Sequence, residues 1–411
     1  MRAEPALRLV VDRRTTPEVG SAPWLTADLG RVLGAASVWG FAFSTFYLLP
    51  KFLAQELAAG PAEIGFTVGV FSCATVLATP FAGWVVDRFP RRYAMIAGAI
   101  LMTVAAAGFL AVRELGWLLD GLRVLQGLSY ALVVTAVGTL VADVVPRERL
   151  NQALGLSGAS MLVMNAVAPA VAEPLAEAVG WQVVFALAAC AATAATVLAA
   201  QVREHAWRPN PAASGGMWAL LAQPIARHYG LVVALNGATF GAVFTFEPAY
   251  ALDLGRTHVS GFFVAYAVAA IVVRCVFGGI PARVGSYRVA RGSLVLYAGV
   301  VFALATAGPM TLEPLGALFG LAHGLFYPAV NALAVTAVRP HERGRMIAIF
   351  TGAFALGLAA GSTLLGPLAE WGGYPSVFVV VACGTLVALA VLVGSKSLRA
   401  AGEALAPVPV R

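Results

Sequence analysis

Residues 83–92 read Gly-Trp-Val-Val-Asp-Arg-Phe-Pro-Arg-Arg, a short cationic segment between two long apolar runs. The flanking runs, at about residues 62–84 and 93–113, can each cross a membrane as a helix, because a hydrocarbon core of about 30 Å needs roughly 20 apolar residues. The same alternation of apolar runs and short connections continues from about residue 30 to about residue 394. We therefore predict an all-α polytopic membrane protein.

The composition agrees with this prediction. Of the 411 residues, 60% are hydrophobic and 11% are charged, whereas an average soluble protein has about 25% charged residues. We predict twelve membrane-spanning helices in two sets of six. The predicted spans are residues 30–55, 62–84, 93–113, 117–142, 151–178, 181–202, 229–253, 259–281, 289–309, 313–337, 344–369 and 375–394.

Between the two sets, residues 203–224 are polar and rich in proline and glycine, which indicates a linker between two halves. This divides the chain into five parts. They are an N-terminal tail (1–29), a first half (30–202), the linker (203–224), a second half (225–394) and a C-terminal tail (395–411).

Lysine and arginine are distributed unevenly between the connections. With the N-terminus placed inside, 22 of the 27 cationic residues lie on the cytoplasmic side, and Lys51, Arg113 and Arg256 lie on the other. The remaining two, Arg123 and Arg274, fall within spans. Positive charge marks cytoplasmic loops, so we predict an inner-membrane protein with both termini cytoplasmic. The net charge of +7 then serves topology and not nucleic-acid binding.

An internal repeat appears at an offset of about 195 residues. One repeated sequence is Pro-Arg-Glu-Arg at 146–149, which corresponds to Pro-His-Glu-Arg at 340–343. Another is Pro-Leu-Ala-Glu, which occurs at 174–177 and again at 367–370. The two copies of Pro-Leu-Ala-Glu are followed by Gly180-Trp181 and by Gly373-Tyr374, respectively. Short polar sequences that recur at the same offset indicate two duplicated halves. This is the architecture of transporters whose halves move about a substrate site at the midplane of the bilayer.

The four cysteines lie in apolar runs and show no paired spacing. They are predicted to be small buried hydrophobic residues. We expect no disulfide, no metal, no cofactor and a monomeric protein in the bilayer.

The segment at 83–92 resembles the loop motif GxxxDRxGRR of the major facilitator superfamily, with Pro90 at a position where the family usually has glycine. The resemblance covers essentially the whole chain, including a second copy at 278–288 in which Ala282 replaces the aspartate. It implies that the aspartate faces the N-terminus of span 11, near residue 344, and holds one transport state. The candidate gating residues are Gly83, Asp87, Arg88, Arg91, Arg92, Gly278, Arg283 and Gly285.

Residues 123–127 read Arg-Val-Leu-Gln-Gly and resemble the family motif RxxQG, which implies a cavity-facing arginine linked to coupling. Arginine is costly inside a membrane and is expected to face a cavity or a partner. The alternative is that Arg123 reaches outward together with Asp120. For Arg274, close to the inner loop, we expect the side chain to extend toward that loop.

Spans 1, 4, 7 and 10, which line the central cavity in this family, carry aromatic and polar residues at helical spacing. The candidate cavity residues are Trp39, Phe43, Tyr47, Gln126, Tyr130, Asn236, Phe240, Tyr327 and Asn331. Ordinary packing between helices would produce the same pattern. The polar members are the stronger candidates, because an unpaired polar group in the membrane costs several kcal/mol.

The residue that carries a coupling proton is left open. The protonatable candidates besides Arg123 are Glu247, His323 and Glu173. A carboxyl group in a cavity of low dielectric can exchange protons near neutral pH, and histidine titrates near neutrality. As alternatives, Glu247 is a solvated charge near a helix end, and His323 is a structural histidine.

These features predict a secondary active transporter of the drug or metabolite efflux type, which exports small, partly apolar organic solutes in exchange for protons. In span 5, residues 168–173 lie where antiporters of the family carry a Gly-Pro motif, but alanines replace the glycines. The alternatives are proton-coupled uptake of a metabolite and, from another class, a membrane enzyme or receptor. The last would need a cluster of ligands, a nucleophile or an extra domain, and we find none in the sequence.

Overall fold

The computed structural model describes residues 26–145, 149–204, 220–276, 284–336, 338–339 and 342–404, which contain helices and no β-strand. The first half comprises α1 (Ala27–Ser44), η1 (Thr45–Leu48), α2 (Leu49–Glu56), α3 (Pro61–Arg88), α4 (Arg91–Gly108), η2 (Phe109–Ala111), α5 (Trp117–Val144), α6 (Leu150–Val179) and α7 (Trp181–Ala200). The second half comprises α9 (Pro224–Asp253), α10 (Ser260–Val276), α12 (Ser286–Leu304), η5 (Pro309–Thr311), α13 (Leu312–Thr336), α14 (Arg343–Thr363) and α15 (Gly366–Gly394), followed by α16 (Lys396–Ala404).

Twelve membrane spans are present, as predicted. In the described ranges, eleven helices are long and apolar enough to cross a bilayer, with α1, η1 and α2 forming the first of them. The twelfth is α10, an apolar helix described over 17 residues. The largest boundary difference lies between the last two spans: α14 ends at Thr363 and not near residue 369, and α15 begins at Gly366 and not near residue 375, with a break at Gly373.

Two equivalent glycines mark the repeat in the backbone. Gly180, between α6 and α7, has φ 92°, and Gly373 has φ 72°. A side chain is disfavoured at positive φ, so glycine suits both positions. Each is followed by a helical segment that starts with a buried aromatic residue, Trp181 or Tyr374. The repeat seen in the sequence therefore corresponds to a repeated turn.

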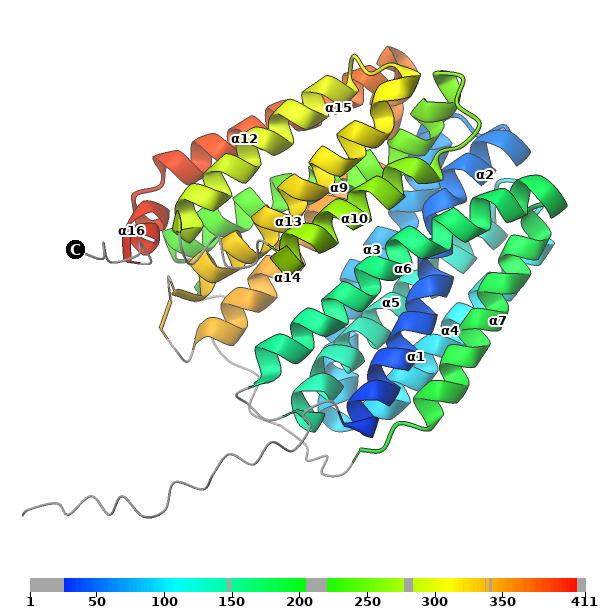
Figure 1. The fold of residues 1–411 in the computed structure, drawn as a ribbon, viewed down its shortest axis with the longest axis horizontal. Coiled ribbons are helices and arrows are strands. Elements are labelled where there is room, and N and C mark those ends of the chain that lie inside the picture. The colour runs from blue at the N-terminus through cyan, green and yellow to red at the C-terminus, as the bar shows by residue number, and fades with distance from the viewer. Residues whose placement is uncertain are drawn as a thin grey trace, which may run out of the picture.

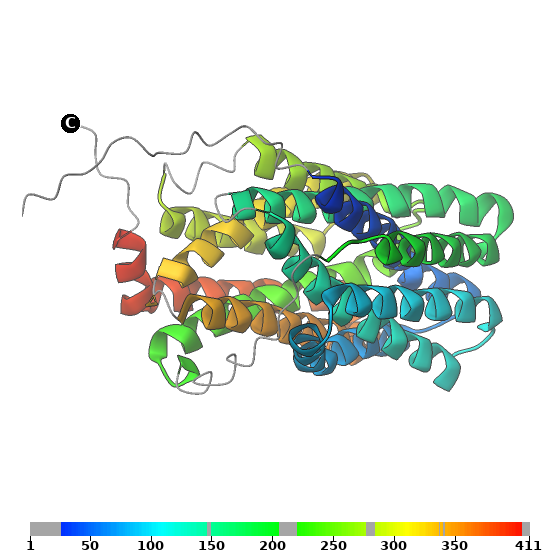
Figure 2. The same cartoon turned by 90° about the horizontal axis from the view of Figure 1, so that it is seen from below.

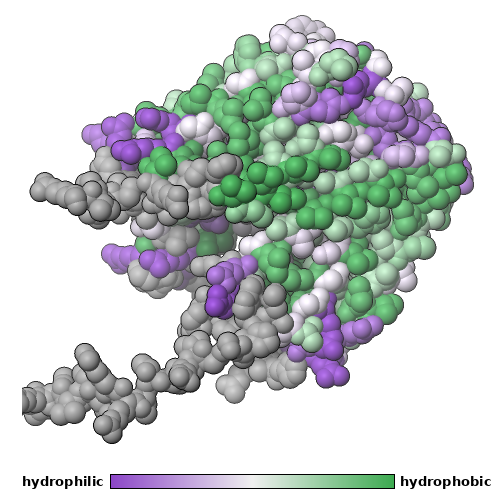
Figure 3. All heavy atoms as spheres, viewed as in Figure 1, coloured by the Kyte–Doolittle hydropathy of each residue, from purple (hydrophilic) through white to green (hydrophobic). Residues whose placement is uncertain are grey.

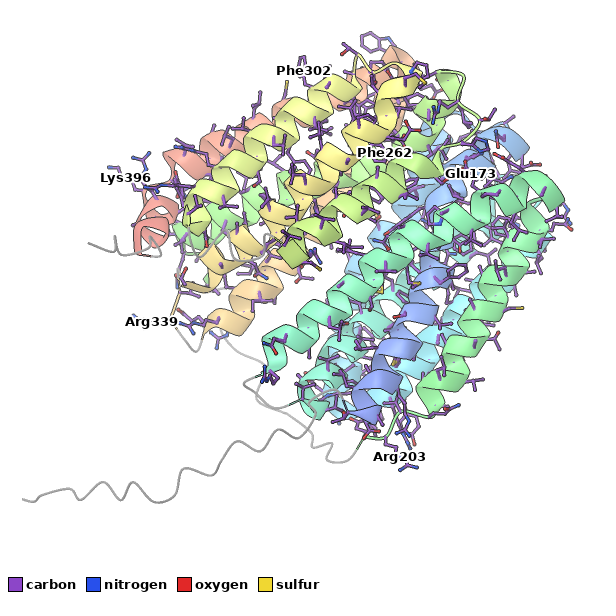
Figure 4. All side chains as sticks on the ribbon, viewed as in Figure 1. Glu173, Arg203, Phe262, Phe302, Arg339 and Lys396 are labelled. Carbon is purple, nitrogen blue, oxygen red and sulfur yellow. The ribbon has the colours of Figure 1, made fainter. Side chains whose placement is uncertain are left out.

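The helices form two bundles that lie side by side and run along the long axis of the molecule (Figures 1 and 2). We call the end where α1 begins and α7 ends the linker end, and the other the opposite end. Arg203, Arg339 and Lys396 lie at the linker end, whereas Glu173 lies toward the opposite end, where the two bundles meet (Figure 4).

The halves contact each other through α3 with α14 and α15, and through α6 with α10. Two glycines on α3 allow close approach to the last turns of α14. A Cβ atom at Gly65 would lie 2.9 Å from the carbonyl oxygen of Ser362, and one at Gly69 would collide with the Thr363 side chain. Both glycines lie in the half of α3 nearer the opposite end, so this contact holds the bundles together there.

The outer surface carries a broad hydrophobic band between hydrophilic ends (Figure 3). Trp117 and Trp371, with 86% and 89% of their surface exposed, lie near the opposite end, as expected of tryptophans at a membrane interface. The prediction that all four cysteines are buried is wrong: each is exposed on the protein surface. An apolar residue in a span can face either lipid or protein. The hydrophobicity of the sequence does not distinguish these two environments.

Candidate functional site: an aromatic network closed at one end

The aromatic stripe of the first span packs against α5. The rings of Trp39 and Phe43 are stacked with centroids 5.4 Å apart, and the ring of Phe43 lies 4.9 Å from that of Tyr130. The indole nitrogen of Trp39 donates a hydrogen bond of 3.1 Å to the hydroxyl of Ser129. Helical spacing of four residues thus places the predicted residues of two spans on one surface.

A matching group forms in the second half. The rings of Phe240 and Phe244 on α9 are stacked 4.1 Å apart, and Phe240 also lies 4.9 Å from the ring of His323 on α13. One turn further along α13, the Tyr327 ring lies 6.0 Å from His323. Phe354 of α14 completes the group, 5.7 Å from Phe240.

Tyr47 joins the two groups. Its ring meets Phe244 of the second half edge-on at 5.2 Å and lies 5.6 Å from Phe263 of α10. We call the connected rings the aromatic network. Its members are Trp39, Phe43, Tyr47, Phe71, Tyr130, Phe240, Phe244, Phe263, His323, Tyr327 and Phe354.

Sequence reasoning missed four of these residues. Phe244 lies one turn after Phe240 and follows from the same spacing, so it could have been found. Phe71, Phe263 and Phe354 lie on α3, α10 and α14, where apolar residues face both lipid and protein and no pattern singles them out.

Three predicted polar residues lie among these helices with incomplete hydrogen bonding. Asn236 is fully buried, and neither its amide oxygen nor its nitrogen makes a hydrogen bond of standard geometry with the described residues. The same holds for the Gln126 amide nitrogen and the Asn331 amide oxygen. Buried polar atoms of this kind are available to a ligand or to water.

Arg123 is buried, with 4% of its surface exposed, and lies inside the protein. Its guanidinium donates to the side-chain oxygen of Gln126 at 2.5 Å and to the carbonyl oxygen of Thr67 at 3.2 Å. It also lies over the Phe71 ring, 4.8 Å from the centroid. The two polar residues of the RxxQG motif therefore bind each other, and among the described residues Arg123 makes no ion pair with Asp120.

Arg274 occupies a comparable position in the second half. Its guanidinium lies 5.9 Å from the centre of the Tyr327 ring. One terminal nitrogen would lie 3.4 Å from a Cβ atom at Gly158, on α6 of the first half. The side chain is half-buried and faces both halves, and the expected extension toward the loop is not what these contacts describe.

At the opposite end, Lys51 is at the centre of a polar cluster that crosses between the halves. Its ammonium group donates to the carboxylates of Glu173 at 2.6 Å and Glu177 at 2.9 Å, both on α6. It also donates to the carbonyl oxygen of Thr257, just before α10, at 2.5 Å. Lys51 and Glu173 are 2% and 1% exposed, so this pair is sealed from water.

Glu173 also binds the first turn of α10. Its two carboxylate oxygens accept hydrogen bonds of 2.8 Å from the backbone amides of Val259 and Ser260. A carboxylate is favourable at a helix N-terminus, where amides lack partners and the dipole is positive. Glu177 also contacts His258, at 3.2 Å. These two acids and His258 could resemble a metal site, but the ammonium of Lys51 already lies between the carboxylates.

Glu247 lies six residues before the end of α9. It is fully buried, and its two carboxylate oxygens have no hydrogen-bond partner among the described residues. The interpretation of Glu247 as a solvated helix-end charge is therefore wrong for this conformation. A buried acid without a partner is costly when ionised.

His323 has a defined partner. Its Nδ1 atom lies 2.7 Å from the hydroxyl of Tyr297 on α12, and either atom can donate, according to the tautomer. The ring is 6% exposed and packs on Phe240. This geometry is compatible both with a structural histidine and with a protonatable one.

At the linker end, the arginine-rich segment forms its contacts inside the first half. Arg91 makes an ion pair with Asp143, at the end of α5. The carboxylate of Glu204, just beyond α7, accepts from the backbone amides of Arg91 and Arg92, both at 3.2 Å. Arg88 lies over Trp84, 5.7 Å from the ring centre.

Asp87 is partly exposed and forms no hydrogen bond or ion pair with the described residues. No described atom lies within 4 Å of a Cβ atom built at Gly83, so no neighbouring helix among the described residues packs closely on this glycine. Gly278 and Arg283 lie outside the described residues, and Gly285 precedes α12 with φ 97°. The predicted contact of Asp87 with span 11 is thus not made here.

Known proteins match this architecture. The sequence model of the Major Facilitator Superfamily matches residues 32–315 and 229–406. The chain belongs to the major facilitator superfamily. As a member of this superfamily it is a multi-pass membrane transporter, and members bind small-molecule substrates in the membrane.

The chain is similar, at low identity, to two export proteins and to a solved transporter structure. The chain is 26% identical to the multi-drug resistance efflux pump PmrA of Streptococcus pneumoniae, over 80% of this chain and 86% of that protein. It is 22% identical to the staphylopine export protein of Staphylococcus aureus, over 81% and 86%. The crystal structure of the nucleoside transporter NupG has the same fold, with a TM-score of 0.76, 14% identity, and coverage of 90% of this chain and all of that one.

Proposed function

We propose that this transporter exports small, partly apolar organic solutes across the inner membrane by alternating access, in exchange for protons. It would act as a monomer without a cofactor, with the linker end and both termini in the cytoplasm. The observation that carries the proposal is the aromatic network, which draws rings from both halves and ends at a sealed polar cluster. A solute bound to the aromatic network would contact both halves of the protein, which move relative to each other in alternating access.

The orientation rests on the uneven distribution of lysine and arginine. If the linker end is cytoplasmic, the Lys51–Glu173 pair closes the structure on the outside, and we infer that the solute enters from the cytoplasm. A transporter in this state accepts its solute from the cytoplasm. That is the loading state of an exporter, and both relatives named above are export proteins by name.

Glu247 is the best candidate for the proton carrier. It is a buried carboxyl group one turn beyond Phe244 of the aromatic network, and its carboxylate oxygens have no described partner. A neutral carboxyl group fits that site better than a carboxylate, because burial disfavours the charged form. His323 is the second candidate, since it lies within the network itself, and Glu173 is the third.

Uptake of a metabolite together with protons is the second candidate function. The same residues would serve it, because alternating access works in both directions. No specific contact favours an enzyme or a receptor.

The test is transport by inverted membrane vesicles and by intact cells. For export, uptake of a solute into inverted vesicles should require a gradient that is acid inside the vesicle, and it should stop when the gradient is collapsed. Uptake by intact cells that depends on an acid exterior would show symport instead. The solute is found beforehand by a thermal-shift screen of the purified protein.

A further inference from the structure

The charges beside the aromatic network are of one sign. Arg123 lies over Phe71 and Arg274 over Tyr327, so each half contributes a guanidinium group stacked on a ring of the network. Among the described residues, no carboxylate pairs with either arginine. The two buried glutamates nearby offer no free negative charge: Glu173 is bonded to Lys51, and Glu247 is fully buried without a partner, an environment that favours its neutral form.

The two arginines differ in their availability. Arg123 is 4% exposed and already uses its guanidinium for Gln126 and a backbone carbonyl. Arg274 is half-buried, makes no hydrogen bond or ion pair with the described residues, and lies toward the linker end of α10. A guanidinium at membrane depth without a counter-ion is unfavourable, and an anion entering from the linker end would relieve this cost.

The surroundings of Arg274 suit the remainder of such a ligand. Tyr327 lies under the guanidinium and makes edge contact with Phe350 at 4.7 Å. Further rings, Phe354 and Phe240, continue from Tyr327 toward the centre. Planar aromatic solutes gain about 0.5–1.5 kcal/mol from each well-placed ring contact beyond simple burial. The amide oxygen of Asn331, one turn from Tyr327, lacks a described partner and can accept a hydrogen bond.

We propose that the transported solutes are aromatic organic anions, with Arg274 binding the carboxylate or sulfonate group and the rings around Tyr327 and Phe240 binding the aromatic body. This inference rests on the proposed function and narrows it to one substrate class. The planar guanidinium binds carboxylates through two parallel hydrogen bonds, a geometry that lysine cannot reproduce. Cations of the same shape are disfavoured, since two arginines lie beside the network and the unpaired acid near it, Glu247, is favoured in its neutral form.

The test compares three naphthalene compounds of nearly equal size and different charge: 2-naphthoate, 2-naphthamide and 2-(aminomethyl)naphthalene. Binding to the full-length protein in lipid nanodiscs is measured by calorimetry at pH 7 without a gradient. The wild type should prefer the anion. Arg274→Gln should weaken naphthoate binding by about ten-fold or more, as expected for losing a charged hydrogen bond, and leave naphthamide binding nearly unchanged. Arg274→Lys should restore part of the preference.

The matched control is Arg227→Gln, which removes one positive charge from an exposed position in the first turn of α9. It should bind naphthoate as the wild type does. Equal or tighter binding of the ammonium compound, an unchanged affinity in Arg274→Gln, or no binding of any of the three compounds would overturn the inference. Exchange of a neutral or cationic solute in proteoliposomes, together with any of these results, would leave the transporter function standing and remove only the anion class.

Discussion

The two ends of the molecule use charged residues in different ways. At the opposite end, Lys51 and Glu173 of the first half bind the start of α10 in the second half, through one carbonyl and two amides. At the linker end, Arg91 binds Asp143, and both residues belong to the first half. Charged bonds cross between the halves at the opposite end, whereas the charged bonds described at the linker end stay within one half.

The difference indicates what the alternate state requires. To open the opposite end, the molecule must separate Lys51 and Glu173 from α10. At the linker end, the described residues form no ion pair between the halves, so closing that end by charge would require new contacts. Asp87 is a residue that can supply such a contact, since it is partly exposed and has no partner among the described residues. We therefore expect the two ends to exchange charged contacts during one cycle.

The largest effect is expected from Glu247, the unpaired acid on the side of the sealed end. Glu247→Gln should reduce gradient-driven transport to background, because the amide cannot carry a proton, while exchange of solute without a gradient should persist. The measurement compares the two modes in proteoliposomes. His323→Gln is the parallel variant. Gradient-driven transport in both single variants would exclude both residues as the required carrier and direct attention to Glu173 or to a different ion.

Lys51→Ala tests the bonds that cross the halves. Removing the ammonium leaves Glu173 buried without its counter-ion in the closed state, which costs about 3 kcal/mol or more and shifts the equilibrium roughly a hundred-fold toward opening of that end. Spin labels at the exposed positions Ala178 and Thr311, one on each half, should report a longer distance.

The control for this variant is the double substitution Lys51→Ala with Glu173→Gln. Without the buried charge, the penalty should shrink, and the short distance should partly return. Identical distance distributions in the wild type and in Lys51→Ala would show that the cluster does not hold this end closed.

A smaller effect is expected from Asp87→Asn. The variant should insert and fold normally but transport about ten-fold more slowly, which corresponds to the loss of about 1.4 kcal/mol at a helix N-terminus in the state that is closed at the linker end. Flux is measured at matched expression levels. If the variant transports at the wild-type rate, Asp87 has no role in closing this end.

The smallest effect is expected from Arg91→Gln. Its ion pair with Asp143 lies within one half, and the two side chains are 17% and 38% exposed. Exposed pairs contribute less than about 1 kcal/mol. Thermal unfolding in detergent should shift far less than for Lys51→Ala. An equal shift in unfolding temperature for Arg91→Gln and Lys51→Ala would contradict the proposed difference between the two ends.

The sequence predicts the helices better than it predicts their partners. Apolar runs of about 20 residues have one physical solution in lipid, the helix, so the twelve spans follow from length and hydrophobicity. The members of the aromatic network on α1 and α13 follow from helical spacing combined with a family resemblance, and their role in a cavity stays a prediction. Phe263 and Phe354 could not be found in this way, since the residues that face lipid on α10 and α14 are as apolar as those that face the centre.

Long-range pairing is the other limit. Lys51 and Glu173 are 122 residues apart, and each looked like an isolated charge near the outer surface. Their contact depends on how α2, α6 and α10 meet, which local patterns do not encode. For Asp87 the limit is different: the predicted contact with span 11 is not among the described contacts, and it stays a prediction for a state that is closed at the linker end.

The carboxylate of Glu173 has one further consequence, for the folding of α10 itself. The first amides of a helix need partners, and here Val259 and Ser260 receive them from the other half. When the halves separate, α10 loses this cap. The stability of its first turn should then fall by about 1 kcal/mol, the contribution of a typical N-cap. Amide hydrogen exchange at Val259 and Ser260 would then count the openings of the transporter. The exchange rate at the start of α10 would therefore report how often the transporter opens at this end.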